Sequence, residues 1–255
     1  MIEDTVPENI TPIAGFPVTR TDADGLAGRL LDALKAGKKV SLFFANTNFI
    51  VQCRAHLPRM RDEGVIVVND GVGLDIAARL LGQQRFPANL NGTDFTPFLL
   101  QRADKPLRVF LLGGKEDVLQ RAAGHARCQL GQKVVGTCNG YEGMRKQADL
   151  ISVMNHRKPD VVLVALGNPV QEAWILKHRH EINAGIVMGV GALFDFWAGA
   201  KPRAPGLVRT LRLEWFYRLC LEPRRLARRY TVDIFRFLAD CHRYRMPAAN
   251  QKAES

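Results

Sequence analysis

Six short apolar runs alternate with helix-length segments between residues 24 and 200, and this alternation restricts the fold more than any other feature of the chain. The runs are almost continuously apolar, which is typical of strands buried on both faces of a sheet. Strands that are joined through helices pair in parallel. We therefore predict an α/β protein with a Rossmann-like, mostly parallel sheet flanked by helices. The predicted strands are Lys39–Asn46, Val65–Asp70, Leu107–Gly113, Lys133–Thr137, Asp160–Gly167 and Gly185–Val190.

The segments between these runs have the lengths and capping signals of helices. Asn168 is expected to cap the helix that follows it, with Pro169 in the first turn. The first twenty residues contain several prolines and predict a loose lead. The predicted helices include Asp24–Ala36, Asn48–Arg61, Glu116–Leu130 and Pro169–Ile182.

The chain changes character after residue 200, where prolines and a glycine interrupt it. Two further helices are expected, at Leu207–Leu221 and Pro223–Arg245. We predict three parts: a Rossmann-like core at 1–200, a helical appendage at 201–246 and a flexible tail at 247–255. Because all six predicted strands precede it, a chain that ends near residue 205 is expected to keep a folded core.

Positive charge is concentrated in that appendage. Residues 201–255 hold 13 Lys and Arg against five Asp and Glu, whereas residues 1–200 hold 23 against 20. The last fifth of the chain therefore carries +8 of the formal net charge of +11. Such an asymmetry predicts an anionic partner, either a phosphate-rich lipid surface or nucleic acid.

Composition excludes several other classes of protein. The apolar fraction of 47% and charged fraction of 24% are those of a globular protein, not of a disordered or fibrous one. No apolar stretch has the length of a membrane-spanning helix, and the acidic start does not resemble a signal peptide, so a cytoplasmic protein is expected. Five cysteines without a CxxC spacing argue against a disulfide framework or a zinc site.

Small and amide-bearing residues follow each predicted strand. In an open parallel sheet, ligands bind beyond the carboxyl ends of the strands. Gly113 and Gly114 would let backbone amides approach a diphosphate, and the helix that begins near Lys115 would direct its positive end to the same edge. The sequence therefore predicts a site for a ligand of nucleotide size at this edge of the sheet.

Asp70 is the carboxylate among these strand ends, and two interpretations are open for it. It is either the N-cap of the following helix or a general base that accepts a proton from an attacking hydroxyl. Gln171 and Glu172 lie in the first turn of another helix, where they either cap the helix or recognise hydroxyl groups. Asp22-Ala-Asp24 matches a DxD metal motif but directly precedes a helix, so capping is the favoured interpretation.

Two other classes of function have weaker support. Gly189-Val-Gly191 begins a dinucleotide fingerprint, but the third glycine is replaced by Phe194, so a nicotinamide oxidoreductase is only an alternative. The aromatic cluster Trp215-Phe-Tyr217 lies among arginines and could stack bases in a nucleic-acid-binding module. Such clusters more often pack a helix onto its own core or onto lipid, and we expect no nucleic-acid partner.

Several blocks together resemble the bacterial WecG/TagA/CpsF glycosyltransferases. The resemblance covers roughly residues 30–240 in order, and its last part lies in the basic appendage. The blocks are Asn46-Thr-Asn-Phe-Ile, Asn69-Asp-Gly-Val-Gly, Asn91-Gly-Thr-Asp, Val109-Phe-Leu-Leu-Gly-Gly, Gly167-Asn-Pro-Val-Gln-Glu-Ala-Trp, Gly189-Val-Gly-Ala-Leu-Phe-Asp-Phe, Arg203-Ala-Pro, Leu213-Glu-Trp-Phe-Tyr-Arg-Leu and Glu222-Pro-Arg-Arg-Leu.

The resemblance implies an inverting transfer of a sugar from a UDP-sugar to a sugar on undecaprenyl diphosphate, with no obligatory metal or other cofactor. Within the family, the similarity to xanthan-type exopolysaccharide assembly favours β-1,4 transfer of glucose from UDP-glucose. Transfer of an N-acetylmannosaminyl group or its uronic acid is the alternative. The same resemblance implies a peripheral protein on the cytoplasmic face of the inner membrane, held at an anionic surface by the appendage; homo-oligomer formation is left open.

The resemblance also assigns roles to individual residues. Asp70 becomes the candidate catalytic base, and no residue is assigned to a metal. Where members of the family often show an arginine before the G-x-D block, this chain has Asn89, with Arg85 nearby. The expected substrate-binding residues are Asn46, Gln171, Gly113, Gly114, Tyr141, Asn168 and Asp195. Of these, Tyr141 and Asp195 are expected near uridine. The expected contacts to the lipid diphosphate or membrane are Arg218, Arg225 and Arg228.

Overall fold

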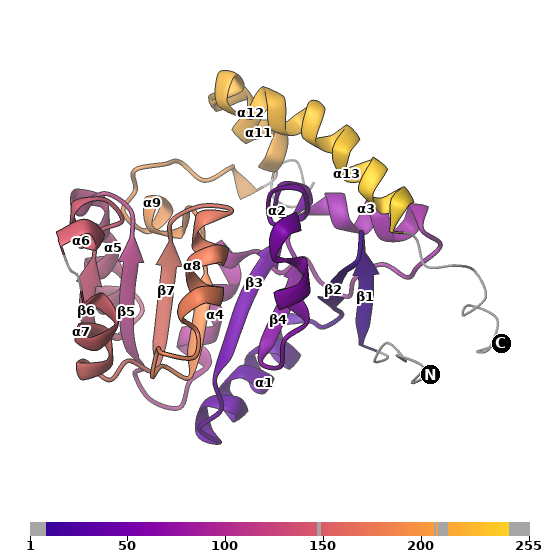
Figure 1. The fold of residues 1–255 in the computed structure, drawn as a ribbon. Helices are drawn as coiled ribbons and strands as arrows, with labels where there is room; N and C mark the ends of the chain where they lie inside the picture. Colours follow the sequence, from indigo (N-terminus) through magenta and orange to yellow (C-terminus); the bar gives the residue numbers. More distant parts are fainter. Residues whose placement is uncertain (1–8, 147–148, 207, 209–213, 245–255) are drawn as a thin grey trace.

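An eight-stranded sheet forms the centre of the protein in a computed structural model that describes residues 9–146, 149–206, 208 and 214–244 (Figure 1). The strand order is β1-β2-β4-β3-β8-β7-β5-β6, and every pair is parallel except β1 with β2. The predicted mostly parallel α/β fold is therefore confirmed. The strands are β1 (Ile10–Ile13), β2 (Phe16–Thr19), β3 (Val40–Ala45), β4 (Val65–Asn69), β5 (Arg108–Gly113), β6 (Lys133–Cys138), β7 (Val161–Ala165) and β8 (Ile186–Gly189).

All six strands predicted from the apolar runs are present, with ends that agree within two residues. Their side chains alternate between two separate hydrophobic clusters, one on each face of the sheet. In β3, Phe43 and Ala45 belong to one cluster, and Leu42 and Phe44 belong to the other. Burial on both faces explains why these strands have no polar alternation in their sequence.

The predicted loose lead is wrong, because residues 10–19 form a β-hairpin. Ile13 pairs with Phe16 across the two-residue turn Ala14-Gly15, in which both residues have positive φ, of 48° and 85°. Positive φ at both central positions is typical of the tight turns that match the twist of a hairpin. Pro12 and Pro17 face each other in the ladder. Pro12 lies on the edge strand β1, and Pro17 precedes the residues of β2 that pair with β4, so both prolines are tolerated, but they conceal the strands from sequence analysis.

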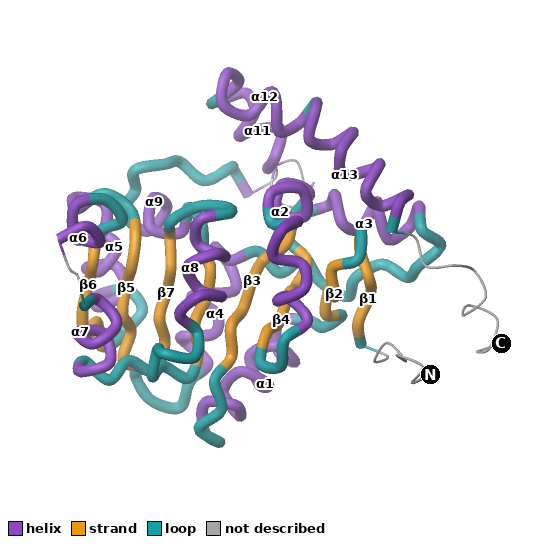
Figure 2. Tube along the Cα trace, in the orientation of Figure 1, coloured by secondary structure: helices purple, strands orange, loops and turns teal. Residues whose placement is uncertain are grey.

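Helices cover both faces of the sheet (Figure 2). One face is covered by α2, α3, α7, α8 and α13, and the other by α1, α4, α5 and α9. The helices are α1 (Ala23–Lys35), α2 (Thr47–Gln52), the 3-10 helix η1 (Arg54–Arg61), α3 (Val72–Leu80), α4 (Gly92–Arg102), α5 (Glu116–Cys128), α6 (Glu142–Lys146), α7 (Leu150–His156), α8 (Val170–His178), α9 (Leu193–Trp197), α11 (Glu214–Leu221), α12 (Pro223–Tyr230) and α13 (Val232–Arg243).

The helix starts agree with the predicted capping in one case and differ in another. The side chain of Asp22 accepts a hydrogen bond from the Gly25 amide, so the Asp22-Ala-Asp24 motif caps α1 as expected. The cap position of α8 is Pro169, not Asn168, and no described side chain caps that helix. The predicted helix at 48–61 is two helices, α2 and η1, that meet at Cys53.

The C-terminal helices lie beyond the carboxyl ends of the strands (Figure 1). The predicted helix at 223–245 is divided at Thr231 into α12 and α13. Phe237 and Cys241 of α13 are buried in the same cluster as the residues of α2 and β2. Residues of α13 therefore take part in the hydrophobic core, and the expectation that a chain ending near residue 205 keeps a folded core remains a prediction. The boundaries predicted for the three parts of the chain remain predictions.

Candidate active site

The carboxyl ends of the strands surround a cleft of about 2180 Å³, which is closed on one side by α12 and α13. Residues that follow β3, β4, β5, β6, β7 and β8 all line it, as the sequence of strand ends predicts. Small-molecule pockets usually measure about 300–1,000 Å³. The volume of this cleft therefore exceeds that of a usual pocket for one small molecule.

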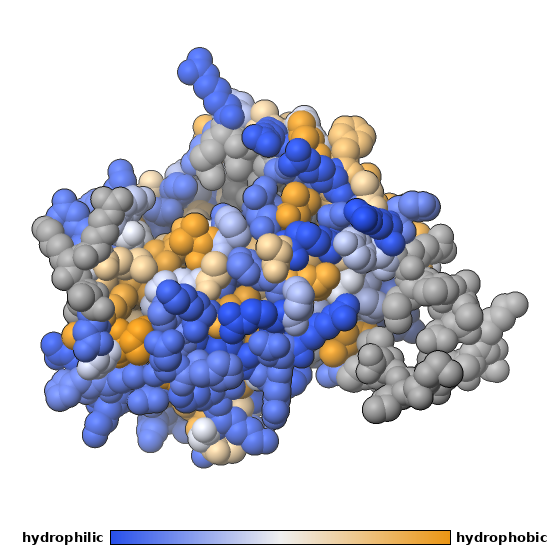
Figure 3. All heavy atoms as spheres, viewed as in Figure 1, coloured by the Kyte–Doolittle hydropathy of each residue, from blue (hydrophilic) through white to orange (hydrophobic). Residues whose placement is uncertain are grey.

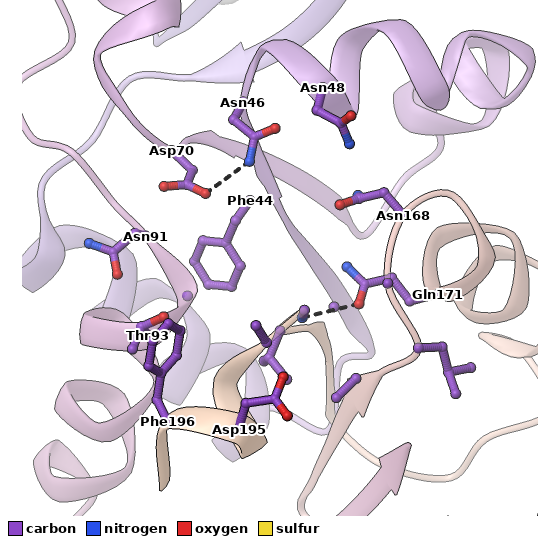
Figure 4. A pocket seen from close by; sticks show the side chains of 18 of the residues that line it. Phe44, Asn46, Asn48, Asp70, Asn91, Thr93, Asn168, Gln171, Asp195 and Phe196 are labelled. Atoms are coloured by element: carbon purple, nitrogen blue, oxygen red, sulfur yellow. Dashed lines mark hydrogen bonds between the residues drawn. The ribbon is translucent and has the colours of Figure 1, made fainter. Parts of the chain in front are cut away.

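Asp70 and Asn46 meet at the centre of this edge (Figure 4). Nδ2 of Asn46 donates a hydrogen bond to Oδ2 of Asp70 at 3.1 Å, while Oδ1 of Asn46 caps α2 by accepting from the Phe49 amide. The helix after Asp70, α3, follows Gly71, and no described side chain caps it. The capping interpretation of Asp70 is therefore wrong, and its carboxylate is half-buried, lines the cleft and is oriented by Asn46.

Asn89, where the family resemblance led us to expect an arginine, supports the turn that carries Asp70. Its Oδ1 accepts a hydrogen bond from the Gly71 amide at 2.5 Å. Gly71 has φ of 90°, a conformation that favours glycine. Arg85 is exposed and does not line the cleft.

Positive charge in the cleft comes from other elements. Lys115 lies at the start of α5, and Lys201 follows α9. Lys201 Nζ is 3.7 Å from Asp195 Oδ2 and 3.4 Å from Glu222 Oε1. Arg228 and Arg236, from α12 and α13, are exposed at the same cleft. These side chains can approach an anionic ligand from the side of the sheet that faces the C-terminal helices.

The residues expected near uridine lie at the end of the cleft next to α5. Tyr141 and Asp195 line it together with Gly114, which was expected to approach a diphosphate, and the side chain of Tyr141 is largely exposed. Asn139 supports the Tyr141 loop, because its Oδ1 accepts from the Tyr141 amide and its Nδ2 donates to Glu116 at 2.7 Å. This hydrogen bond from Asn139 holds the pKa of Glu116 below its usual range.

Gly113 has a different role from the one expected. It does not line the cleft, and its φ of 118° places it against the carbonyl of Ala165 in β7. An added Cβ would lie 2.3 Å from that carbonyl oxygen. Gly113 is therefore needed for the close approach of two chain segments at the end of β5.

Asn168 and Gln171 line the cleft next to β7 and β8, whereas Glu172 is buried behind them with 1% of its surface exposed. Asn168 Nδ2 and Gln171 Nε2 both donate to Glu172 Oε1, at 2.6 and 2.7 Å. Burial raises the pKa of Glu172. Recognition of substrate hydroxyls by Glu172 is therefore wrong, because its carboxyl does not reach the cleft.

The contact between Asp94 and Arg203 was not expected from the sequence. Arg203 Nη1 lies 2.7 Å from Asp94 Oδ1, and Asn91 Nδ2 donates to the other carboxylate oxygen at 2.9 Å. These contacts fasten the segment after α9 to the start of α4 at the cleft. Both segments are among the blocks of the family resemblance, but their pairing across more than 100 residues has no local signal.

Arg228 is the expected lipid-diphosphate residue that the structure places in the cleft. Arg218 and Arg225 belong to α11 and α12, and their side chains lie outside the described residues. Within the described part of the chain, no group of three or more His, Cys, Asp or Glu residues could hold a metal ion. None of the described helices is long and apolar enough to cross a membrane.

Two curated proteins are similar to this chain over much of its length. Both are named N-acetylglucosaminyldiphosphoundecaprenol N-acetyl-beta-D-mannosaminyltransferase, from Bacillus spizizenii strain W23 and Bacillus subtilis strain 168. Each is 33% identical over 169 and 168 residues respectively, which is 65% of this chain and 64% of the relative. The match thus spans less than two thirds of the length of these relatives.

A solved structure, nicotinate phosphoribosyltransferase from Vibrio cholerae, resembles the chain weakly. The identity is 14%, the TM-score is 0.22, and the match covers 68% of this chain and 47% of the other. A likeness at this level carries no argument about fold or function. The family match is of another kind, because it extends over residues 11–251 and includes the strands, the cleft and the C-terminal helices. This chain belongs to the glycosyl transferase WecG/TagA/CpsF family.

Proposed function

We propose that this protein transfers an N-acetylmannosaminyl group from a UDP-sugar to N-acetylglucosaminyl-diphospho-undecaprenol, with inversion at the anomeric carbon. The observation that carries the proposal is the Asn46–Asp70 pair at the sheet edge of a cleft larger than a usual pocket for one small molecule. Family membership and the names of the two relatives support the choice of sugar and acceptor. They favour the mannosaminyl alternative over the glucose transfer expected from sequence.

The chemistry assigned to Asp70 is general-base catalysis. The carboxylate accepts the proton of the acceptor hydroxyl as that oxygen bonds to the anomeric carbon of the donor, and the bond to the UDP oxygen breaks on the opposite face. Asn46 can only donate to Asp70 through Nδ2, since its Oδ1 is engaged in capping α2. The contact holds Oδ2 of Asp70 in place at the wall of the cleft.

The leaving UDP carries two phosphate groups, and their developing charge needs stabilisation. The chain has two sources for it: the start of α5 with Gly114, and the cations Lys115, Lys201 and Arg228. Because Asn89 is committed to the Gly71 turn, we assign this role to the cations and not to the loop before α4. No metal is assigned to the reaction.

The acceptor's lipid stays in the bilayer, so the enzyme must work at a membrane surface. The C-terminal helices present both kinds of side chain that such a surface requires (Figure 3). Phe216 and Phe235 are 51% and 74% exposed, and Arg224 and Arg228 are exposed near them in sequence. Apolar insertion together with about 1 kcal/mol per well-placed basic residue gives reversible binding to anionic lipid.

The donor sugar can be tested directly with a panel of sugar nucleotides. The protein is incubated with N-acetylglucosaminyl-diphospho-undecaprenol and UDP-N-acetylmannosamine, its uronic acid, UDP-glucose or UDP-N-acetylglucosamine, and the lipid product is weighed by mass spectrometry. We expect transfer from UDP-N-acetylmannosamine, with the anomeric configuration inverted by NMR. Transfer from UDP-glucose alone would contradict the proposed sugar, and absence of both transfer and UDP-dependent thermal stabilisation would contradict the class.

A further inference from the structure

The buried carboxyl of Glu172 holds two cleft side chains at once. Its Oε1 accepts one hydrogen bond from Asn168 Nδ2 at 2.6 Å and a second from Gln171 Nε2 at 2.7 Å. The amide of Gln171 is also held at its other end, since its Oε1 accepts from the Gly191 amide at 3.1 Å. One carboxyl thereby joins α8 to the β7–α8 loop, and through Gln171 to the turn after β8.

These contacts decide which atom each amide turns toward the carboxyl. A side-chain amide can rotate by half a turn and exchange its nitrogen for its oxygen, with little change in shape. Both amides reach the same oxygen, Oε1, and a carboxyl oxygen that carries no proton accepts hydrogen bonds and donates none. Asn168 and Gln171 must therefore direct their nitrogens to Glu172, and the oxygen of Asn168 then lies on the side of the cleft where Asn46 and Asn48 lie (Figure 4).

We propose that Glu172 is a positioning residue that orients the amides of Asn168 and Gln171, so that the Asn168 oxygen meets a hydroxyl or acetamido N–H of the bound sugar. The proposal rests on the proposed function, because it assigns the sugar-contacting side of the same cleft. It predicts selection for ligands that donate a hydrogen bond at this place. A group that can only accept would leave the Asn168 oxygen unpaired.

The second oxygen of Glu172 indicates that packing alone does not explain this residue. Oε2 is buried beside the thiol of Cys53 and accepts no hydrogen bond from a nitrogen or oxygen donor among the described residues. An apolar side chain of similar size would avoid the cost of burying that oxygen. The two amide contacts at Oε1 are the feature that an apolar side chain could not supply.

The test compares binding of UDP with binding of UDP-sugar by calorimetry. In Glu172→Gln, the new amide can present either its oxygen or its nitrogen, so the orientation of Asn168 is no longer unique. We expect UDP affinity to stay within about twofold of the parent, and the preference for UDP-N-acetylmannosamine over UDP to fall about tenfold, as for one lost hydrogen bond. Glu181→Gln, which removes an exposed carboxylate near the end of α8, is the control and should leave both affinities unchanged.

Two further variants extend the test, and the first of them does not depend on the folding of Glu172→Gln. Asn168→Ala should lower the same preference by a similar factor. In the double variant Asn168→Ala, Glu172→Gln, the second change should add little, because both act through one hydrogen bond to the sugar. An Asn168→Ala protein with the parent's preference for UDP-sugar over UDP would overturn the proposal.

NMR of the protein with ¹⁵N-labelled Asn and Gln provides a readout that needs no substrate. The side-chain amide signals of Asn168 and Gln171 should shift in Glu172→Gln and stay in place in Glu181→Gln. Equal losses of UDP and UDP-sugar affinity, with a lower Tm, would mean that Glu172 is only structural. If the parent binds neither ligand, the proposed function fails, while the NMR comparison still decides whether Glu172 orients the two amides.

Discussion

The side chain of Asn46 has two roles, because it caps α2 and also contacts the candidate base, Asp70. Asn46 holds the start of α2 with its oxygen and Asp70 with its nitrogen. The orientation of the carboxylate therefore depends on the backbone of α2 and is set before substrate binds. Preorganisation of this kind contributes to catalysis because the base need not be reoriented in the transition state.

Replacing Asp70 by Asn should remove the proton acceptor and leave the shape of the cleft intact. We expect turnover to fall about 10²-fold or more, as is typical for loss of a general base, with UDP affinity nearly unchanged. Turnover is measured on lipid-linked acceptor and UDP affinity by calorimetry. Near-parental turnover would exclude Asp70 as the base, and Asp94 and Asp195 would then be the candidates to replace.

The titration of Glu172 should be visible in protein stability. Burial raises its pKa above the ordinary value of 4.5, so the folded state binds this proton more tightly than the unfolded state. Its contribution to stability is fully present below pH 4.5 and is lost as pH rises through the folded-state pKa. The Tm of the parent relative to Glu172→Gln should therefore fall with rising pH from 4 upward. A Tm difference that is constant with pH would contradict the raised pKa.

At the scale of whole elements, α13 is fastened to the sheet by Arg54, at the junction of α2 and η1. Arg54 Nη1 donates to the Ala14 carbonyl of the β1–β2 turn at 2.6 Å, and Nη2 lies 2.9 Å from Asp240 Oδ2 of α13. The guanidinium also lies over the rings of Phe16 and Tyr244, at 5.1 and 4.6 Å from their centroids. One side chain thus connects the N-terminal hairpin with the last described helix.

Removing the Arg54 side chain should loosen this attachment. We expect Arg54→Met to cost about 2 kcal/mol, because charge-assisted hydrogen bonds in a partly buried place are lost, and to lower Tm by about 4–8 °C. The matched control is Arg102→Met, which removes an exposed pair with Asp24 at 2.8 Å and should cost less than about 1 kcal/mol. Equal effects of the two substitutions would show that Arg54 does not fasten α13.

The N-terminal hairpin and α13 show which features of single elements could not be predicted from the sequence. The strands at 10–19 were missed because their prolines and short length obscure the β-pattern, and only pairing with β4 makes them part of the sheet. A helix was expected over the residues of α13, but helical periodicity does not show which surface the helix packs against. The structure places Phe237 and Cys241 against the core, and leaves Phe235 and Leu238 exposed.

For the whole molecule, the arrangement of charge predicts how it meets a membrane. The exposed arginines of the C-terminal helices should attract anionic vesicles, and the exposed aromatic side chains should insert. We expect the triple charge reversal Arg224→Glu, Arg228→Glu, Arg236→Glu to abolish flotation with anionic vesicles. Added salt should release the intact protein only partly, because salt screens charge but does not oppose apolar insertion.

A control for flotation changes net charge equally at another surface. Lys105 after α4, Arg127 in α5 and Lys133 in β6 are exposed outside the C-terminal helices, and their reversal to Glu should leave flotation close to the parental level. If the C-terminal triple variant floats like the parent while its self-association is lost, the helices serve oligomer formation and the membrane proposal is wrong. Equal loss in both triple variants would indicate a response to net charge alone.

The sequence by itself determined the parallel sheet and the edge at which the cleft lies. Both follow from local pattern: apolar runs specify strands buried on two faces, helical connections make them parallel, and parallel strands end at one edge. The same reasoning brought Asp70, Asn46, Asn168 and Gln171 to the cleft before any contact between them was known. A family resemblance, carried by those strand ends, was confirmed over residues 11–251.

The tertiary structure alone decided which of these polar groups touch. Asn46 donates to Asp70, Asn168 and Gln171 turn their nitrogens to a buried Glu172, and Asp94 pairs with Arg203. A hydrogen bond depends on distances of tenths of an ångström and on the direction of each lone pair, whereas a sequence pattern fixes only a face or an end of an element. The candidate base could thus be named from the sequence, but the side chains that orient it and its neighbours required the folded chain.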